Sequence, residues 1–345
     1  MADNNTPQYS VVSLRNLLEM KIPEREWIAY PFIQEKSLTI LYAQRGIGKT
    51  YFAMTLGMAI ASGKDVCNFT IPKSRAVLYI DGEMTGKDFQ DRITNLGFGM
   101  DLCNTDTFDR FKILSNDLSE STLPNIGTPK GQEQITTLLG DCELIIIDNL
   151  SALCSFGKEN EAESWTPMQR WLIELKRSGK SVLLIDHSGK DPEHGNRGTS
   201  KKQDIMDAVV SLEKPASYNI TDGAKFVMRY QKSRNVAGSI LKPVGFQLET
   251  VGEQGFVSWS EFKVTESPNQ TKREAEKSQK LELVRNLRSQ GKSYRDIESE
   301  TGISKSTVGE LAKQLKTEPS QESTPAEPEP MQIDLEDLNE SMFPD

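Results

Sequence analysis

Apolar runs alternate with amphipathic stretches along the first 260 residues of the chain. Four β-branched or leucine-rich runs predict buried strands at Ser37–Ala43, Ala76–Asp81, Glu143–Asp148 and Ser181–Asp186. Apolar residues at helical spacing predict helices at Thr50–Ser62, Lys87–Leu96 and Trp165–Leu175. Near-continuous apolar strands separated by helices predict an α/β fold, a parallel sheet covered on both faces.

The pattern changes in the second half of the chain. The runs Asp207–Leu212, Lys225–Tyr230 and Gly245–Thr250 have no helices between them, so we expect antiparallel additions to the sheet. Further on, Lys280–Ser289 and Lys305–Lys316 have apolar residues at helical spacing and predict a small all-α module. No run approaches the roughly 18 apolar residues of a membrane span, so integral membrane proteins are excluded.

These patterns divide the 345 residues into five parts. We expect an N-terminal segment, an α/β domain, a linker, a helical domain and a disordered acidic tail, at 1–22, 23–260, 261–278, 279–316 and 317–345. The net charge is −9, and the tail after Thr317 holds nine carboxylates and no Lys or Arg, so it carries the whole net charge. Residues 271–316 carry 11 basic and 7 acidic side chains, so the acidic average does not argue against nucleic-acid binding.

Cysteine and histidine usage indicates the compartment. Four cysteines form no CxxC pair and there are two histidines, so we expect no structural zinc site and a reducing cytosol. The first ten residues have neither the basic nor the apolar segment of a secretion signal. We therefore expect a cytoplasmic, nucleoid-associated protein without a membrane partner.

A glycine-containing loop follows the first predicted strand and leads into a helix. The sequence AQRGIGKT (Ala43–Thr50) fits the phosphate-loop pattern GxxxxGK[ST], with Ala43 in place of the first glycine. Glycines allow the backbone N–H groups to surround phosphates, and the helix N-terminus favours their negative charge. We predict ATP and Mg²⁺ as cofactors, with Lys49 on the terminal phosphates and Thr50 on Mg²⁺. The predicted nucleotide contacts are Gln44, Arg45, Gly46, Ile47, Gly48, Lys49, Thr50 and Tyr51.

Carboxylates end two of the predicted strands. Asp148 ends an apolar run, which suits an aspartate that orders Mg²⁺ and its waters, and an ordinary strand-end turn is the alternative. Glu83 lies in the sequence Asp81-Gly-Glu just after the second strand, where a carboxylate could polarise the attacking water. Asp81 is the competing candidate for this role, and a plain turn is the alternative to both.

Polar and basic residues follow the later strands. His187 is at the tip of the fourth strand, where ligands of parallel sheets lie, and is either a sensor of the terminal phosphate or a structural histidine. The segment 188–202 is basic and suits either DNA contact or a solvated surface, with Lys190, Arg197, Lys201 and Lys202 as candidate DNA contacts. Lys232 and Arg234 end a late strand, as a polar edge or as an arginine finger that reaches a neighbouring subunit.

In order, the segments AQRGIGKT, LYIDGE, LIIID, LLIDH and KSR resemble the RecA-like core of hexameric plasmid replicative helicases of the RepA type. The resemblance covers residues 23–259 and extends to the broader RecA/KaiC-like (AAA_25-like) ATPases. It implies that Glu83 is the catalytic carboxylate, that Asp148 is the strand-end aspartate and that His187 is the sensor. It further implies that Lys232 and Arg234 act in trans, and that 151–166 and 188–202 are loops that grip single-stranded DNA. The first of these loops is acidic rather than basic, which departs from that pattern.

The C-terminal module resembles the helix-turn-helix of resolvase-type DNA-binding domains. Ser293 is placed to cap its second helix, and Gly302 to end that helix before the third helix begins. In that geometry the third helix enters the major groove of duplex DNA, and its first residues meet DNA: Ser304, Lys305, Ser306 and Thr307. A trihelical bundle that contacts protein is the alternative. The tail mixes apolar and acidic residues, so it is either a peptide for a protein partner, a mimic of DNA charge or a solvated end.

Together these residues predict an ATP-dependent DNA motor. The favoured reading is a homohexameric replicative helicase of a plasmid, phage or integrated mobile element, which hydrolyses ATP between subunits and moves along single-stranded DNA. The alternatives are a RecA-like recombination or loading ATPase that does not unwind DNA, and a DNA-binding regulator switched by ATP.

Overall fold

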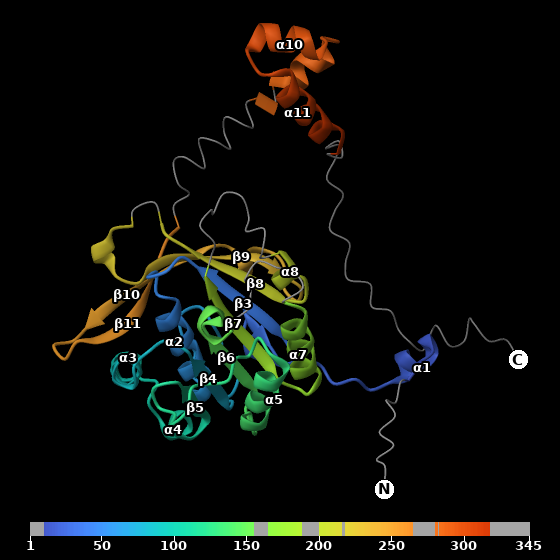
Figure 1. Ribbon diagram of the computed structural model, residues 1–345. Coiled ribbons are helices and arrows are strands. Elements are labelled where there is room, and N and C mark those ends of the chain that lie inside the picture. The colour runs from blue at the N-terminus through green and yellow to red at the C-terminus, as the bar shows by residue number, and fades with distance from the viewer. Residues whose placement is uncertain are drawn as a thin grey trace, which may run out of the picture. The chain divides into compact units, whose positions relative to one another are not determined.

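The chain folds as two compact units, Met1–Thr265 and Glu266–Asp345 (Figure 1). The computed structural model describes residues 10–154, 165–187, 200–215, 218–264, 280–281 and 283–317. In these ranges, no helix has both the length and the apolar character needed to cross a bilayer.

A nine-stranded sheet forms the centre of the first unit (Figure 1). Its strands lie in the order β5-β4-β6-β7-β3-β8-β9-β10-β11. Six are parallel: β3 (Leu38–Ala43), β4 (Val77–Asp81), β5 (Phe111–Ser115), β6 (Leu144–Asp148), β7 (Ser181–His187) and β8 (Ala208–Glu213). The antiparallel remainder consists of β9 (Lys225–Ser233), β10 (Val244–Val251) and β11 (Phe256–Phe262). The mostly parallel α/β sheet expected from the sequence is confirmed.

Helices cover both faces of this sheet (Figure 1). One face packs against α2 (Lys49–Ser62), α3 (Gly86–Gly99) and α4 (Thr105–Arg110), the other against α5 (Pro129–Leu138), α6 (Leu150–Leu153), α7 (Thr166–Arg177) and α8 (Ser200–Asp204). Successive strand residues alternate between the two cores: Val77 and Tyr79 join the α2 core, whereas Leu78 and Ile80 join the other. Shorter elements complete the unit, namely α1 (Leu14–Glu19), β1 (Trp27–Ala29), β2 (Ile33–Gln34) and the 3₁₀ turns Ile220–Asp222 and Ser239–Leu241.

Helix α2 is enclosed on all sides. Twelve of its 14 residues are buried, rather than the single apolar face that the sequence suggested. The indole Nε1 of Trp259 on β11 donates to Thr55 Oγ1 at 2.9 Å, so the antiparallel end of the sheet covers the outer side of the helix. A helix that is apolar all round is stable only in such a place, because it has no face for water.

Three sheet predictions need correction or addition. Strand β8 pairs in parallel with β3, so the expectation that Asp207–Leu212 is an antiparallel addition was wrong. The chain between β7 and β8 includes the short helix α8, as a connection between parallel strands usually does. The polar sequence of this segment has no helical periodicity, so the helix could not be predicted from the sequence. Strands β5 and β11 were missed as well. Each lies at a sheet edge, where half-exposed residues blur the apolar pattern.

The second unit has a small core of its own. Its described helices are residues 283–289, α10 (Tyr294–Thr301) and α11 (Lys305–Thr317). Ser293 caps α10 through Asp296 N–H, and Gly302 ends it with a φ of 71°, which glycine adopts readily. The buried side chains are Val284, Leu287, Ile297, Ile303, Val308 and Leu311. Whether these helices form a DNA-binding helix-turn-helix stays a prediction.

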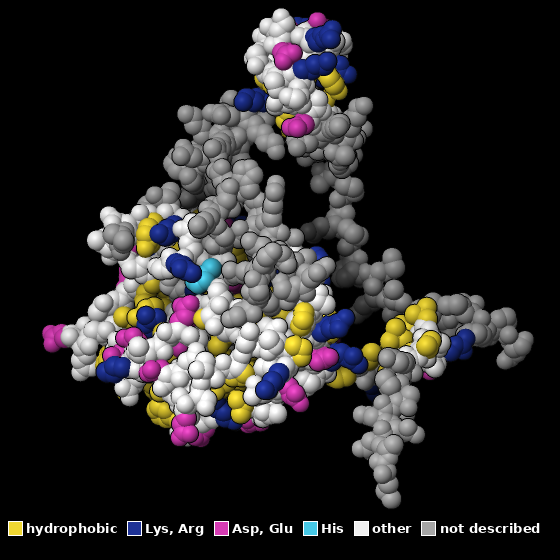
Figure 2. All heavy atoms as spheres, viewed as in Figure 1, with side chains coloured by type: hydrophobic (Ala, Val, Ile, Leu, Met, Phe, Trp, Pro, Cys, Tyr) yellow, Lys and Arg dark blue, Asp and Glu magenta, His cyan; other side chains and the backbone are white. Residues whose placement is uncertain are grey.

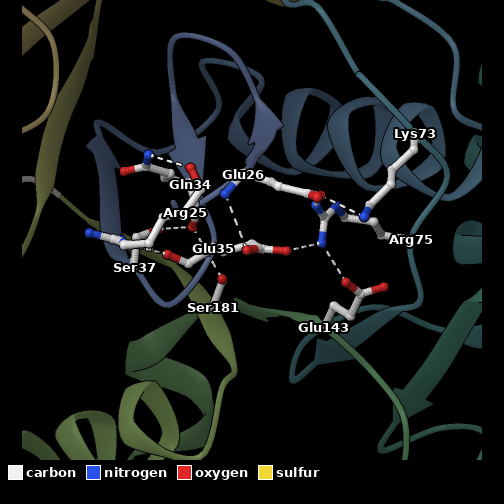
Figure 3. Close-up of polar contacts among 9 residues, drawn as sticks. All are labelled: Arg25, Glu26, Gln34, Glu35, Ser37, Lys73, Arg75, Glu143 and Ser181. Atoms are coloured by element: carbon white, nitrogen blue, oxygen red, sulfur yellow. Dashed lines mark hydrogen bonds and ion pairs between the residues drawn. The ribbon is translucent and has the colours of Figure 1, made fainter. Parts of the chain in front are cut away.

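A buried guanidinium ties the β1–β2 hairpin to the sheet (Figure 3). The side chain of Arg75, just before β4, is 0% exposed. Its Nη1 donates to Glu35 Oε1 at 2.7 Å and Glu143 Oε2 at 2.5 Å, and its Nη2 donates to Glu26 Oε2 at 2.7 Å. Lys73 also pairs with Glu26, but its side chain is 54% exposed. One cation therefore holds together three carboxylates from separate segments.

We predict that Arg75→Met lowers the free energy of unfolding by about 3 kcal/mol, because it leaves three carboxylates without their shared cation. Lys73→Met is the matched control and should cost less than about 1 kcal/mol, since exposed pairs contribute little. Urea unfolding followed by tryptophan fluorescence measures both, because all four tryptophans lie in the first unit. Equal losses for the two variants would contradict the role of Arg75.

Candidate active site

The predicted phosphate loop joins β3 to α2 at the carboxyl end of the parallel strands. Gly46 and Gly48 have φ values of 75° and 109°, in the left-handed region that favours glycine. Ile47 is buried, whereas Gln44 and Arg45 are exposed. The loop is thus anchored by one apolar side chain, and α2 begins directly after it at Lys49. This geometry suits an anion at a helix N-terminus.

Gly48 also makes the closest packing contact of the loop. A Cβ atom built at this residue would lie 2.6 Å from the Cβ of Ala224, just before β9. No side chain fits there, so glycine is required by space as well as by φ. The antiparallel part of the sheet therefore supports the phosphate loop from one side.

The ammonium group of Lys49 is buried, with 6% of the residue exposed. Its Nζ donates to the backbone oxygens of Ala43 at 3.0 Å and Gln44 at 2.9 Å, and lies 3.1 Å from His187 Nδ1. Burial lowers the pKa of Lys49 to about 8, although the nearby carboxylates of Asp148 and Asp186 act in the opposite direction. Among the described residues, no carboxylate forms an ion pair with Lys49, so its charge is available to a phosphate.

His187 ends β7 beside this ammonium group. A lysine ammonium can only donate, so Nδ1 of His187 is the acceptor, and the neutral ring carries its proton on Nε2. Burial and then the charge of Lys49 lower the pKa of His187. The structure thus brings the predicted sensor into contact with the predicted phosphate-binding lysine.

Asp148 and Thr50 lie together next to the loop. Asp148 is 3% exposed, and burial raises its pKa while hydrogen bonds from Tyr79 and Thr50 lower it. The hydroxyl of Tyr79, on the neighbouring strand β4, donates to Asp148 Oδ2 at 2.5 Å. Tyr79 was missed by sequence reasoning because only the register of β4 and β6 reveals this contact.

These donors fit a magnesium ion that is completed by nucleotide. Mg²⁺ commonly keeps several waters and takes one or two protein oxygens together with phosphate oxygens. Thr50 and Asp148 supply such oxygens, and a cation would offset the cost of burying the Asp148 carboxylate. Among the residues described, no group of three or more His, Cys, Asp and Glu side chains could hold a metal without phosphate.

The two candidate carboxylates after β4 have different surroundings. Asp81 is 2% exposed, and its Oδ2 accepts from the Met84 backbone N–H at 3.0 Å. Burial raises its pKa to about 6. Glu83 is exposed and acts electrostatically on Lys49 and His187. The hydrogen bond of Asp81 shapes the turn, whereas the side chain of Glu83 remains open to a water molecule.

Lys232 and Arg234 lie away from the phosphate loop of their own chain. Leu212 of β8 pairs with Ala43, at the carboxyl end of β3, on one side and with Met228 of β9 on the other. Lys232 of β9 pairs with Val209, nearer the start of β8. Four residues of strand put Lys232 about 13 Å further along the sheet, toward the amino end of β3. The Arg234 side chain is 47% exposed.

The candidate DNA contacts divide into three groups. Lys190, Arg197 and residues 155–164 of the first predicted loop lie outside the described residues. On α8, Lys201 is exposed, but Lys202 forms an ion pair with Asp186 at 2.9 Å. In the second unit, Ser304, Lys305 and Ser306 are exposed and Thr307 is partly exposed.

A cation–π contact joins the loop to α3. The guanidinium of Arg92 lies 4.8 Å from the ring centre of Tyr51, which directly follows Thr50. Arg92 was missed by sequence reasoning because it belongs to an amphipathic helix whose charged residues otherwise read as a solvated face. It adds a positive group beside the first turn of α2.

Residues 4–193 match the model of the AAA_25 family, described as an AAA domain. This match spans more than half of the chain. The chain belongs to the AAA_25 family. The family and the mostly parallel sheet together confirm the expected RecA-like P-loop ATPase core. They do not test a helicase role.

Solved structures of low identity also resemble this AAA_25 chain. A KaiC-like protein of Pyrococcus horikoshii has a TM-score of 0.46 at 14% identity and covers 68% of this chain and 93% of its own. Flagellar accessory protein FlaH of Methanocaldococcus jannaschii has a TM-score of 0.46 at 14% identity, with coverages of 66% and 90%. The RadB recombinase has a TM-score of 0.44 at 16% identity, with coverages of 65% and 90%. The sequence has no significant match among curated proteins.

Nucleotide affinity of this AAA_25 ATPase should depend on the charge of Lys49. Above pH 8 the buried amine is increasingly neutral in the free protein and must gain a proton to hold phosphate. We predict that the Kd for Mg-ADP rises about tenfold for each pH unit above 8. Isothermal titration calorimetry measures this slope. Lys49→Arg, whose guanidinium stays charged, should show a flat profile, and parallel slopes for both proteins would refute the assignment.

Removal of the Tyr79 hydroxyl should weaken the magnesium site. Tyr79→Phe keeps the ring contact with Phe89 but leaves one oxygen of Asp148 without its donor. We predict that the Mg²⁺ concentration for half-maximal ATP hydrolysis rises about tenfold, as for other groups that orient metal ligands. Tyr42→Phe, on β3, is the matched control and should not alter the Mg²⁺ requirement. An unchanged requirement in Tyr79→Phe would exclude this positioning role.

Proposed function

We propose that this AAA_25 protein is an ATP-driven DNA motor, a homohexameric helicase that hydrolyses ATP between subunits and moves along single-stranded DNA. Lys49 and Thr50 hold the phosphates and Mg²⁺, and Glu83 polarises the attacking water. His187 senses the terminal phosphate, and Lys232 and Arg234 act on the nucleotide of the neighbouring subunit. The setting would be replication of a plasmid, phage or integrated mobile element.

The position of Lys232 and Arg234 is the observation that carries this proposal. Lys232 lies near the end of β9, which runs away from the phosphate loop, and Arg234 follows that strand, so neither is placed near the phosphates that Lys49 of the same chain would bind. Arg234 is half exposed, as a group that reaches another subunit must be. A basic pair so placed suits a nucleotide that lies between two copies of the chain, in addition to its contacts with α8 of its own chain.

The second unit supports a duplex-DNA partner. The first residues of α11 are polar and mostly exposed, and Lys and Arg side chains gather on the face of this unit seen in Figure 2. Backbone phosphates are bound by such surfaces, and helix N-termini add to the attraction. We propose that this unit binds duplex DNA while the first unit binds the single strand. The acidic tail, outside the described residues, is proposed to bind a protein partner.

A strand-displacement assay tests the motor. Wild-type protein with Mg-ATP should release the labelled strand of a forked duplex, and hydrolysis should accelerate when single-stranded DNA is added. Lys49→Ala should lower hydrolysis by about 100-fold or more and abolish displacement, because it removes the charge that meets the terminal phosphates. Lys130→Ala, an exposed lysine on α5, is the matched control and should behave as wild type.

Two outcomes would replace the proposal. If DNA stimulates hydrolysis but no strand is displaced from duplexes with either a 5′ or a 3′ single-stranded end, a recombination or loading ATPase would be favoured. Hydrolysis that ignores DNA, with tight duplex binding through the second unit, would favour a DNA-binding regulator switched by ATP.

A further inference from the structure

Helix α8 carries a lysine that is partly buried rather than exposed. Nζ of Lys202 donates to Asp186 Oδ2 at 2.9 Å, and the two side chains are 12% and 4% exposed. The same ammonium lies 5.7 Å from the ring centre of Trp165. Its neighbour Lys201 is exposed. Two adjacent lysines that look alike in the sequence therefore have different surroundings.

Asp186 connects this ion pair to the active site. Its second oxygen, Oδ1, accepts from the backbone N–H of His187 at 2.8 Å. His187 in turn contacts the Lys49 ammonium through Nδ1. Lys202, Asp186 and His187 thus form a continuous chain of contacts that ends at the phosphate loop.

The other side of α8 is held by the basic pair of β9. Lys232 Nζ donates to the backbone oxygens of Gln203 at 2.8 Å and Asp204 at 3.3 Å. Arg234 Nη2 donates to the same Asp204 oxygen at 2.8 Å. The last carbonyls of a helix lack partners within the helix, so cations bind there readily.

This ion pair joins α8 to β7, with its carboxylate buried and its ammonium partly buried. Removing either charge leaves the other buried without a partner, and this is costly. A movement of α8 therefore moves Asp186, and with it the backbone that positions His187. The contacts with Lys232 and Arg234 carry the same movement to the residues that we propose to act in trans.

We propose that the Lys202–Asp186 ion pair couples α8 to His187, which makes Lys202 a positioning residue for the terminal-phosphate site and not a DNA contact. The link from α8 onward to the neighbouring subunit rests on the proposed function, through the trans role of Lys232 and Arg234. The link from Lys202 to His187 does not, because it lies within one chain. Contiguous hydrogen bonds and ion pairs of this kind can carry coupling between sites when the element that they hold has two arrangements.

The test uses the full chain and the imidazole NMR signals of ¹⁵N-labelled histidine, since the chain has two histidines and His194→Gln identifies the other. We predict that Lys202→Met shifts the His187 signals and lowers kcat for ATP hydrolysis without DNA about tenfold, with KM for ATP within about twofold. Lys202→Arg keeps the ion pair and should restore most of kcat. Lys130→Met, which removes an exposed charge, should leave both readouts as in wild type.

A double-mutant cycle isolates the pair. Lys202→Met combined with Asp186→Asn should lose no more activity than the worse single variant, because each change already breaks the connection. Fully additive losses in kcat would show that the two side chains act independently and would overturn the proposal.

Binding of fluorescent oligo-dT separates the two roles of lysine. We expect Lys202→Met to bind as wild type, whereas Lys201→Met should bind more weakly, with a salt dependence reduced by about one unit. Lys202→Met with unaltered His187 signals and kcat but weaker DNA binding would restore Lys202 as a DNA contact. If wild type binds no DNA, the motor proposal fails, while the His187 signals and basal kcat still decide this inference.

Discussion

A buried positive charge governs the phosphate end of the sheet. The Lys49 ammonium is almost wholly enclosed, and its direct partners are two backbone oxygens and a neutral imidazole. Burial of a cation without a counterion is costly, so the free protein holds this group at a free-energy cost that an anion relieves. The left-handed glycines and the start of α2 shape the loop around this ammonium, and His187 contacts it. A phosphate bound in the loop would therefore meet the Lys49 charge.

The two halves of the sheet divide the chemistry between them. The parallel strands end at the same edge, so Asp148, His187 and the phosphate loop meet there although they are distant in sequence. Strand β9 runs the other way, so Lys232, near its end, and Arg234, just after it, lie toward the amino ends of the parallel strands. One sheet thus presents a phosphate-binding site at one end and a basic pair toward the other, which is the arrangement that the proposed sharing of nucleotide between subunits requires.

Local patterns predicted much of the fold and part of the site. The phosphate loop could be found because its glycines, lysine and flanking strand and helix are contiguous in sequence. The contacts Tyr79–Asp148 and Lys202–Asp186 could not, because they depend on strand register and on a crossover without periodicity. Sequence alone also left Asp81 and Glu83 as rivals for one role. The family resemblance favours Glu83, and the structure adds that Asp81 accepts from Met84 N–H while Glu83 is exposed.

The close approach of Gly48 to Ala224 has an evolutionary consequence. The floor of the phosphate loop is made by a residue that lies 176 positions later in the chain and has no chemical role of its own. Because φ and space both keep residue 48 a glycine, the constraint falls on residue 224, which must leave room for the loop backbone. Substitution in the turn that leads into the antiparallel strands is therefore constrained by the phosphate loop.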